Sequence, residues 1–281
     1  MNEQIGVLHI VATPIGHLDD ITRRALDILQ QADYVAAEDT RHSSKLLGHY
    51  NINSRLISLH EHNEIEQCQR IINDLEAGKN IALISDAGTP LISDPGYKLV
   101  EQALKQGCKV SPIPGPSAII AALSVAGQPT DRFTFEGFLP AKQGQRRKLL
   151  EALVQEPRTM VFYESTHRLV DCLSDIAHTL GVERNMSLVK EITKSFEQIH
   201  KGTVQDVMDW LDEDPARCKG EFVLILRGAQ VEPDQLDEGA KQLMSLLIEH
   251  LPPNKAAAVV AQHYNVRKNV IYQWALSHKD K

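Results

Sequence analysis

Short apolar runs alternate with amphipathic segments along the first 130 residues. These runs have almost no polar alternation and lie at residues 8–12, 34–37, 56–59, 81–84 and 109–113. Between them, apolar side chains such as Ile21, Ala25 and Ile28 recur at helical spacing, and Asp19 or Asp20 precedes them as a candidate helix cap. Apolar strands separated by helices are typical of a parallel sheet that is covered on both faces.

A second block, residues 133–228, has a more mixed pattern. Strands are predicted at residues 133–137, 159–163, 187–191 and 222–226, with helices at 145–155, 167–180 and 203–211. The longer loops favour antiparallel pairing. Residues 231–240 are acidic and contain Pro233, which is typical of a linker or a helix start.

The last thirty residues predict a helical hairpin with its turn at Tyr264–Asn265. This pattern fits a helix-turn-helix unit that contacts RNA, and equally a small helical cap whose basic side chains are only solvated. We therefore expect a two-domain α/β protein plus a C-terminal helical unit. The predicted boundaries are 1–113 for the parallel-sheet domain, 114–229 for the mixed-sheet domain and 236–281 for the helical unit.

Composition narrows the class of protein. The 281 residues carry a net charge of −7, which argues against a protein that coats nucleic acid along a broad surface. The apolar runs are too short to span a membrane, and the N-terminus has no basic segment of the kind that begins a signal peptide. Four widely spaced cysteines fit reduced thiols in a cytoplasmic protein, not a disulfide framework or a zinc site.

Two loops that leave the predicted strands combine turn residues with ionisable groups. Residues 12–17, ATPIGH, follow the first strand but lack the glycines of a dinucleotide fingerprint, so a nicotinamide enzyme is disfavoured. Residues 38–42, EDTRH, follow the second strand, where a charged cluster can contact substrate or relay charge. The alternative for this cluster is a helix cap made by Asp39 or Thr40, with Arg41 neutralising its neighbours.

Two further loops are unusually rich in proline and glycine. Residues 85–96, SDAGTPLISDPG, hold two prolines, two glycines and two Ser-Asp pairs directly after an apolar strand. Such a loop brings rigid backbone close to a ligand, which a plain turn does not require. Residues 112–118, PIPGPSA, form another rigid connection from strand to helix. The sequence contains no phosphate-binding P-loop, no GxSxG elbow and no spaced set of metal ligands.

These four loops, in this order, resemble those of the tetrapyrrole-methylase superfamily of S-adenosylmethionine-dependent enzymes. The strings FTFEGFLP, FYESTHRL and KEITKSFEQIHKGT extend the resemblance to bacterial 16S rRNA cytidine-2′-O-methyltransferases, over essentially all of residues 6–280. The resemblance implies methyl transfer from S-adenosyl-L-methionine to a ribose 2′-hydroxyl in the decoding region of 16S rRNA. It also implies a homodimer that acts on 16S rRNA within the small ribosomal subunit.

The resemblance also implies which residues bind the cofactor. They come from both domains and are Thr13, Pro14, Ile15, Asp86, Ala87, Gly88, Thr89, Ser117, Ala118, Phe162 and Tyr163. Tetrapyrrole methylases usually have a glycine-rich first turn, which Thr13-Pro14 partly replaces here. This departure favours the rRNA branch over a small tetrapyrrole substrate.

The residues that move the proton remain open. Because a ribose hydroxyl is a weak acid, a base or a cation beside it should help, and we consider Asp39, Glu38 and Glu191 as bases with Arg41 and Lys190 as partners. Glu164 and His167 are further candidates, and every one of these residues could instead form a structural ion pair. Candidate RNA contacts are basic side chains in two segments, namely Lys142, Arg146, Arg147, Lys148, Arg267 and Lys268.

Two other functions keep the same fold. The first is methylation of a small molecule or a protein side chain, which would need neither the basic segments nor the C-terminal hairpin. The second is an RNA-binding assembly factor whose cofactor pocket has decayed. The intact loop at 85–96 argues against the second.

Overall fold

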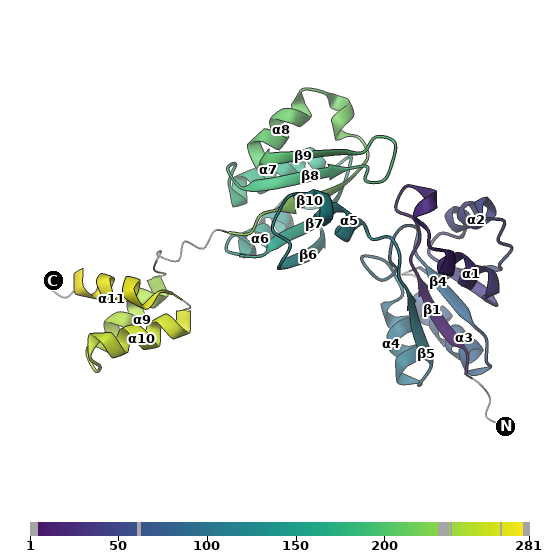
Figure 1. The fold of residues 1–281 in the computed structure, drawn as a ribbon, viewed down its shortest axis with the longest axis horizontal. Coiled ribbons are helices and arrows are strands. Elements are labelled where there is room, and N and C mark those ends of the chain that lie inside the picture. Colours follow the sequence, from purple (N-terminus) through teal and green to yellow (C-terminus); the bar gives the residue numbers. More distant parts are fainter. Residues whose placement is uncertain (1–4, 61–62, 230–235, 237, 265, 278–281) are drawn as a thin grey trace. The chain divides into compact units, whose positions relative to one another are not determined.

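The computed structural model describes residues 5–60, 63–229, 236, 238–264 and 266–277. The chain forms two compact units, which meet in sequence at Arg227 and Gly228, and each is described here by itself (Figure 1). None of the helices in the described ranges is long and apolar enough to cross a membrane. The domain boundaries predicted at residues 113 and 229 remain predictions.

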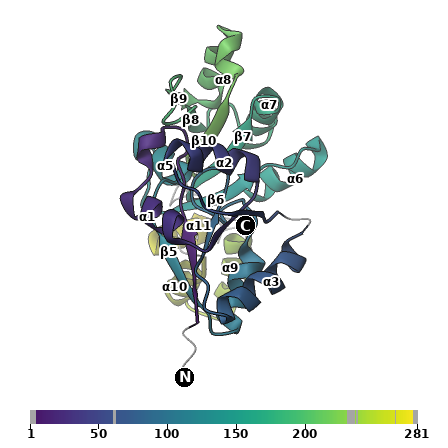
Figure 2. The ribbon, with the colours of Figure 1, turned by 90° about the vertical axis from the view of Figure 1, so that its right-hand side faces the viewer.

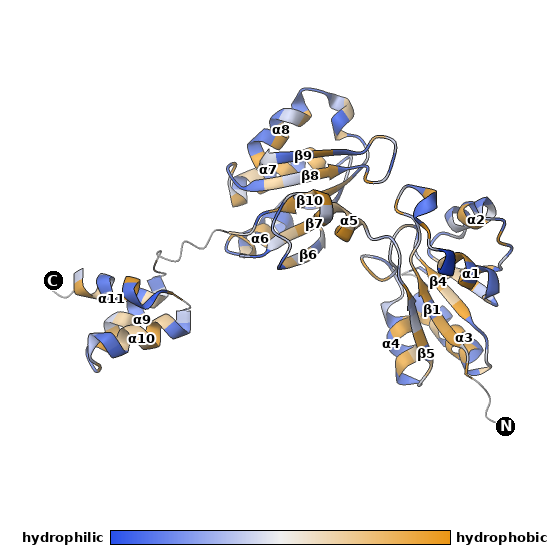
Figure 3. Ribbon diagram, viewed as in Figure 1, coloured by the Kyte–Doolittle hydropathy of each residue, from blue (hydrophilic) through white to orange (hydrophobic). Residues whose placement is uncertain are grey.

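The first sheet of the larger unit is entirely parallel. Its order is β3-β2-β4-β1-β5, formed by β1 (Val7–Val11), β2 (Tyr34–Ala37), β3 (Leu56–Ser58), β4 (Ile81–Ile84) and β5 (Lys109–Ile113). Every residue of β2 and β4 is buried, which explains why these strands show no polar alternation. In Figure 3, β4 is drawn in the orange of hydrophobic residues. The chain crosses the sheet in one direction from β1 to β2 and in the other direction from β4 to β5. The loops after β1 and β4 therefore diverge at the carboxyl edge of the sheet, which is where ligands bind in such sheets.

Two pairs of helices cover this sheet, one pair on each face. Figure 2 shows one helix of each pair, α1 and α3, on opposite sides of the sheet. Apolar side chains of α1 (Arg23–Gln31) and α2 (Thr40–His49) pack on one face, and those of α3 (Glu64–Glu76) and α4 (Tyr97–Lys105) pack on the other. The predicted cap of α1 was wrong, because Asp19 and Asp20 lie in a separate short 3-10 turn, Leu18–Asp20. Thr22 caps α1 instead, accepting a hydrogen bond from the Ala25 amide at 3.1 Å.

The second sheet is mixed, as predicted. Its order is β6-β7-β10-β8-β9, formed by β6 (Phe133–Phe138), β7 (Thr159–Ser165), β8 (Asn185–Lys190), β9 (Gln198–Thr203) and β10 (Glu221–Leu226). Only β6 and β7 pair in parallel. The sequence pattern missed β9, because this edge strand is mostly exposed and polar and so lacks an apolar run.

Helices cover the two faces of the second sheet unequally. One face packs against α6 (Gln143–Ala152), α7 (Leu169–Leu180) and α8 (Val204–Asp212), and the other against α5 (Ala118–Val125) alone. Residues therefore alternate along β7. Met160 and Phe162 enter the core beneath the three helices, whereas Val161 and Tyr163 face α5.

The smaller unit is a set of three helices, α9 (Glu238–Ile248), α10 (Pro253–Tyr264) and α11 (Lys268–Ser277). Small residues such as Ala240, Ala257 and Ala275 are buried where these helices meet. The predicted helix–turn–helix pattern agrees with α10 and α11. Its turn residue Asn265, and most of the linker predicted at 231–240, lie outside the described residues.

Candidate functional site

Backbone pairing joins the first loop to the third at the carboxyl edge of the first sheet. The Thr13 amide donates to the Gly88 carbonyl at 2.9 Å, and the Gly88 amide returns a bond to the Thr13 carbonyl at 3.1 Å. The Thr13 hydroxyl also donates to the Ser85 carbonyl at 3.3 Å. Gly88 has φ +80, a conformation that glycine adopts without strain. Thr13 is fully buried, so it holds the two loops together instead of facing a ligand.

The second and fourth loops are tied to the same place. The Asp39 amide donates to the Asp86 carboxylate at 3.1 Å, which joins the second loop to the third. The Thr89 hydroxyl donates to the Pro116 carbonyl at 3.0 Å, which joins the third to the fourth. The four segments selected from the sequence thus form one connected rim above the parallel strands.

A cleft of about 390 Å³ opens beside this rim. Seven of the eleven predicted cofactor-binding residues line it, and these are Ile15, Ala87, Gly88, Thr89, Ser117, Ala118 and Tyr163. Further lining residues come from β6, β7, β10 and the loop after β8, so both sheets contribute to its walls. The volume and the mostly apolar lining are ordinary for a small-molecule site.

The other four predicted cofactor residues do not line the cleft. Thr13 and Asp86 bond to neighbouring loops, and Pro14 is buried. Phe162 is fully buried on the opposite face of β7 from Tyr163, where it packs in the core beneath α7. Their structural role is to hold the walls of the cleft in position.

The chemistry of the cleft fits S-adenosylmethionine. Aromatic walls are provided by Tyr163 and Phe138, whose ring centroids lie 5.6 Å apart. The carboxyl group of Asp94 is available for a cation or a hydroxyl, and the hydroxyl of Ser117 is a further polar contact. Gly88 and Ile15 both line the cleft, and because glycine has no side chain, its backbone can approach a ligand closely. A Cβ at this glycine would lie 3.3 Å from the Ile15 methyl carbon.

Sequence reasoning missed three ionisable residues of the cleft, Asp94, Lys194 and Glu221, and Asp94 is the one whose surroundings favour the neutral form. Burial raises the pKa of its carboxyl to about 6; a hydrogen bond from Ser85 opposes this shift, and the charge of Asp86 adds to it. Burial, followed by the charge of Asp94, also raises the pKa of the Tyr163 hydroxyl to about 12. The sequence feature that could have identified Asp94 is the second Ser-Asp pair of the 85–96 loop, Ser93-Asp94. There the adjoining Ser93 is held at φ +68, an uncommon conformation for this residue type.

None of the predicted catalytic residues Glu38, Asp39, Arg41 and Glu191 lines the cleft. Asp39 caps α2, accepting from the Arg41 amide at 2.8 Å, and hydrogen bonds from Arg41 lower the pKa of its carboxyl. The Glu191 carboxylate accepts from the Glu221 amide at 2.8 Å and from the Lys194 ammonium at 3.0 Å. Burial opposes ionisation of Glu191, but these bonds outweigh it and lower its pKa. A lowered pKa makes either carboxylate a poor base.

Lys190, Glu164 and His167 were the remaining candidates. Lys190 is buried and donates to the Ala216 carbonyl at 2.9 Å, which is a structural contact. Glu164 is among the residues that line the cleft, but its side chain is buried and pairs with Arg168 at 3.5 Å. His167 is not among the residues that line the cleft.

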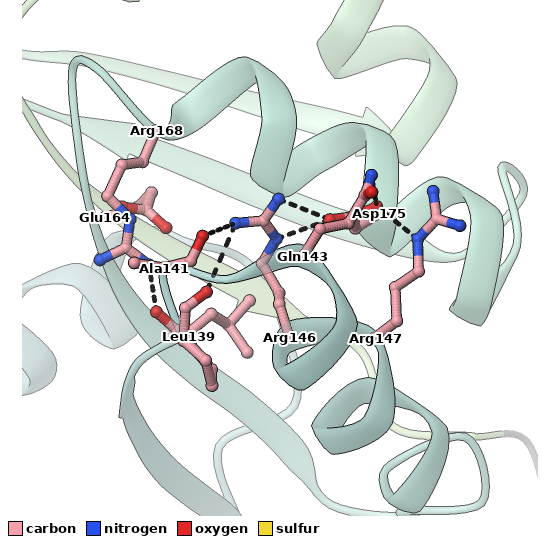
Figure 4. A network of polar contacts seen from close by, with 9 residues as sticks. Leu139, Ala141, Gln143, Arg146, Arg147, Glu164, Arg168 and Asp175 are labelled. Carbon is pink, nitrogen blue, oxygen red and sulfur yellow. Dashed lines mark hydrogen bonds and ion pairs between the residues drawn. The ribbon is translucent and has the colours of Figure 1, made fainter.

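The basic segment predicted to contact RNA is partly engaged inside the second domain (Figure 4). The Arg146 guanidinium donates to the Asp175 carboxylate at 2.6 Å, and Arg147 donates to the same carboxylate at 2.7 Å. The Arg146 side chain is only 5% exposed, so it is not available to a phosphate, and the predicted RNA contact at Arg146 was wrong. Lys142 and Lys148 remain exposed.

Asp175 was not considered in the sequence pattern, although it accounts for these two arginines. It lies on α7, 29 residues after Arg146, and its side chain is fully buried. In the C-terminal unit, Arg267 and Lys268 are exposed at the start of α11. The described residues contain no group of three or more His, Cys, Asp or Glu side chains placed to hold a metal ion.

Comparison with protein families gives two matches along the chain. Residues 7–208 match the model for tetrapyrrole (corrin/porphyrin) methylases, and residues 234–279 match the model for the RsmI C-terminal HTH domain. Among curated proteins, the ribosomal RNA small subunit methyltransferase I of Pasteurella multocida is 52% identical over 279 residues, covering 99% of each chain. The protein of the same name from Escherichia coli O157:H7 is 52% identical, covering 96% of this chain and 95% of that protein.

Solved structures with the same fold are more distant in sequence. Uroporphyrin-III-C-methyltransferase from Thermus thermophilus superposes with a TM-score of 0.55 at 19% identity, covering 79% of this chain and 94% of that one. The methyltransferase CobJ gives a TM-score of 0.59 at 16% identity, covering 80% and 95%. These structures confirm the predicted two-domain α/β fold class and say nothing about the substrate.

Proposed function

Because the chain belongs to the tetrapyrrole methylase family, and within it to the ribosomal RNA small subunit methyltransferase I proteins, we propose that it methylates a cytidine ribose 2′-hydroxyl in 16S rRNA. The observation that carries this proposal is the near-full-length similarity to relatives of that name. The cleft at the predicted loops adds a site of suitable size and chemistry.

Family membership confirms the predicted enzyme class, a methyltransferase, and its cofactor, S-adenosyl-L-methionine. It also removes the nicotinamide enzyme from consideration. Methylation of a small molecule is disfavoured, since the chain has the C-terminal helix-turn-helix domain that such an enzyme does not need. A decayed pocket is disfavoured because the four loops are fully connected and the cleft is open.

The main task of the protein in this reaction is alignment. S-adenosylmethionine supplies a methyl group that is already activated on a sulfonium centre. The connected rim fixes the cleft, so that the acceptor oxygen can be held in line with the methyl carbon. We propose that Asp94, which lines the cleft, takes the hydroxyl proton as the oxygen–carbon bond forms and the carbon–sulfur bond breaks. Its raised pKa suits this role better than the lowered values at Asp39 and Glu191.

The predicted cellular context is also part of the proposal. The family resemblance supports a homodimer, a cytoplasmic location and the assembled small subunit as substrate. We expect contacts with RNA phosphates from four exposed side chains, namely Lys142, Lys148, Arg267 and Lys268. Arg147 contributes in part, because it is shared with Asp175. Glu38 and Arg41 belong to the rim next to Asp39.

The test is a methyl-transfer assay with labelled S-adenosylmethionine. Small ribosomal subunits from cells that lack the gene, and naked 16S rRNA in parallel, are incubated with the purified protein and mapped by nuclease digestion and mass spectrometry. Label on one cytidine ribose is expected, and the comparison identifies the stage of assembly. Absence of label in both substrates, despite measurable cofactor binding, would contradict the proposal.

The base is tested in the same assay with Asp94→Asn and a matched control, Asp27→Asn. Asp27 is an exposed carboxylate on α1. The Asp94 variant should lose about 10²- to 10⁴-fold in kcat, the usual range for general-base catalysis, while keeping its affinity for the cofactor. Equal loss of cofactor binding would show that Asp94 is a cofactor ligand instead.

A further inference from the structure

The exposed face of α2 carries a row of basic side chains. Arg41, Lys45 and His49 follow one another at four-residue spacing, which places them on one side of a helix. All three are exposed, whereas Ser43 and Leu47 on the other side are buried. The Arg41 side chain is 90% exposed, and Lys45 makes no ion pair with any residue in the described part of the chain.

The segment around this helix is unusual for an acidic protein. Residues 40–60 contain no aspartate or glutamate, although the whole chain has 37 acidic residues and a net charge of −7. Over the same residues there are two arginines, one lysine and three histidines. The nearest acid is Asp39, which precedes the helix and pairs with Arg41 at 3.2 Å. Such an exposed pair is weak, so a phosphate can compete for the guanidinium.

A second cavity lies at the C-terminal end of this helix. It is open, has a volume of about 550 Å³, and is lined by His49 of α2, by His17 and Asp19 after β1, and by residues 193–195 after β8. Lys194 lines both this cavity and the cofactor cleft. The His17 amide donates to the Thr193 hydroxyl at 3.2 Å, which holds the two walls together. The end of the basic face at His49 therefore borders a cavity that has Lys194 in common with the cofactor cleft.

We propose that the exposed face of α2, through Arg41, Lys45 and His49, binds the phosphate backbone of the substrate RNA next to the target nucleotide. The proposal rests on the proposed function and adds the surface by which the RNA is held. Phosphates suit a helix face that presents the charges of Arg41 and Lys45 together with the imidazole of His49, because such contacts position the strand without reading bases. In contrast, both arginines of α6 already share the buried carboxylate of Asp175.

The experiment compares two double variants of the full-length protein. Arg41→Gln/Lys45→Gln changes the α2 face, and Arg70→Gln/Lys105→Gln removes the same charge from exposed positions on α3 and α4, which cover the opposite face of the sheet. Affinity for naked 16S rRNA is measured between 0.05 and 0.2 M salt, the range over which phosphate contacts are revealed. Cofactor affinity and thermal unfolding are measured for both variants.

Counterion release gives the expected size of the effect. A salt slope of about 0.8 per phosphate contact corresponds to about sixfold in affinity per contact at 0.1 M salt. Loss of two contacts should therefore weaken RNA binding about 40-fold and reduce the salt slope by about 1.6. The control variant should bind RNA as the parent does, and both variants should keep the parent's cofactor affinity and unfolding temperature.

Two results would overturn the proposal. The first is an unchanged affinity and salt slope in the α2 variant, and the second is an equal loss in the α2 and control variants, which would mean a general charge effect. The methyl-transfer assay distinguishes failure of the α2 proposal from failure of the proposed function. If the parent binds 16S rRNA through α2 but labels no ribose, the surface stands and the proposed reaction falls.

Discussion

The buried carboxylate of Asp175 offers a sharp test of what holds the second domain together. Its side chain is fully buried and bonds to Arg146, which is 5% exposed, and to Arg147, which is 35% exposed. Burial opposes ionisation of Asp175, but the bonds from the two arginines outweigh it and lower the pKa of this carboxyl. Replacing Asp175 by alanine leaves the Arg146 guanidinium buried with only the carbonyls of Pro140 and Ala141 as acceptors.

The expected magnitudes follow from burial. Removing one partner of a buried ion pair costs about 3–5 kcal/mol of unfolding free energy, so Asp175→Ala should fall in that range. Arg147→Ala removes a pair that is open to solvent on one side, and it should cost about 1 kcal/mol. The double variant Arg146→Met/Asp175→Leu should recover most of the loss, because apolar side chains can replace a buried pair at little cost.

Urea unfolding followed by tryptophan fluorescence measures these values. Trp210 of α8 packs against the same core as α7, whereas Trp274, the other tryptophan of the chain, lies in the C-terminal unit. A Trp274→Phe background therefore isolates the signal of the second domain. A loss below 1 kcal/mol for Asp175→Ala, or equal losses for Asp175→Ala and Arg147→Ala, would refute the reasoning from burial.

Three further predictions concern the parallel-sheet domain. Because the pKa of Asp94 is raised in the folded protein, the free energy of unfolding should fall as pH rises from about 4 to 6. Asp94→Asn should abolish this fall and be more stable than the parent by about 1–2 kcal/mol at pH 8. Urea titration at pH 5 and 8 measures both effects. Gly88→Ala forces a side chain to φ +80 and should cost about 1–2 kcal/mol in thermal unfolding, with weaker cofactor binding in calorimetry. Glu64 accepts from the Gly96 and Lys98 amides at 3.2 Å each, so Glu64→Gln should lose about 1 kcal/mol by urea unfolding. An unchanged stability in any of the three would contradict the contact that motivates it.

Much of the fold could be predicted because its signals are local. Strands β2 and β4 are buried along their whole length, so their apolar runs stand out in the sequence. The exposed strand β9 had no such run and was missed. The prolines and glycines of the 85–96 loop likewise indicated the rim of the cleft, because these residue types by themselves restrict or widen the backbone conformations of a loop.

Roles that depend on distant partners could not be read in the same way. Asp39 carries a carboxylate at a strand end, which fits both a catalytic base and a helix cap, and only the structure shows that it caps α2. The sequence predicts an exposed cation at Arg146, whereas in the structure its guanidinium donates to the carboxylate of Asp175, 29 residues later in the chain. Asp94 was passed over because its pKa shift comes from burial in the cleft, which no sequence pattern reports.

An acidic enzyme that must hold RNA faces a problem of charge distribution. With a net charge of −7, long-range attraction to a polyanion is unfavourable, so binding has to come from places where acids are locally absent. Two segments of the larger unit combine an absence of acids with three or more lysines and arginines, residues 40–60 and residues 140–150. In the second segment, both arginines share the buried carboxylate of Asp175. In the first, Arg41 and Lys45 are exposed, and His49 lines a cavity that has Lys194 in common with the cofactor cleft. The second segment has four lysines and arginines against three in the first, but the surroundings of these side chains favour α2 as the RNA-binding surface.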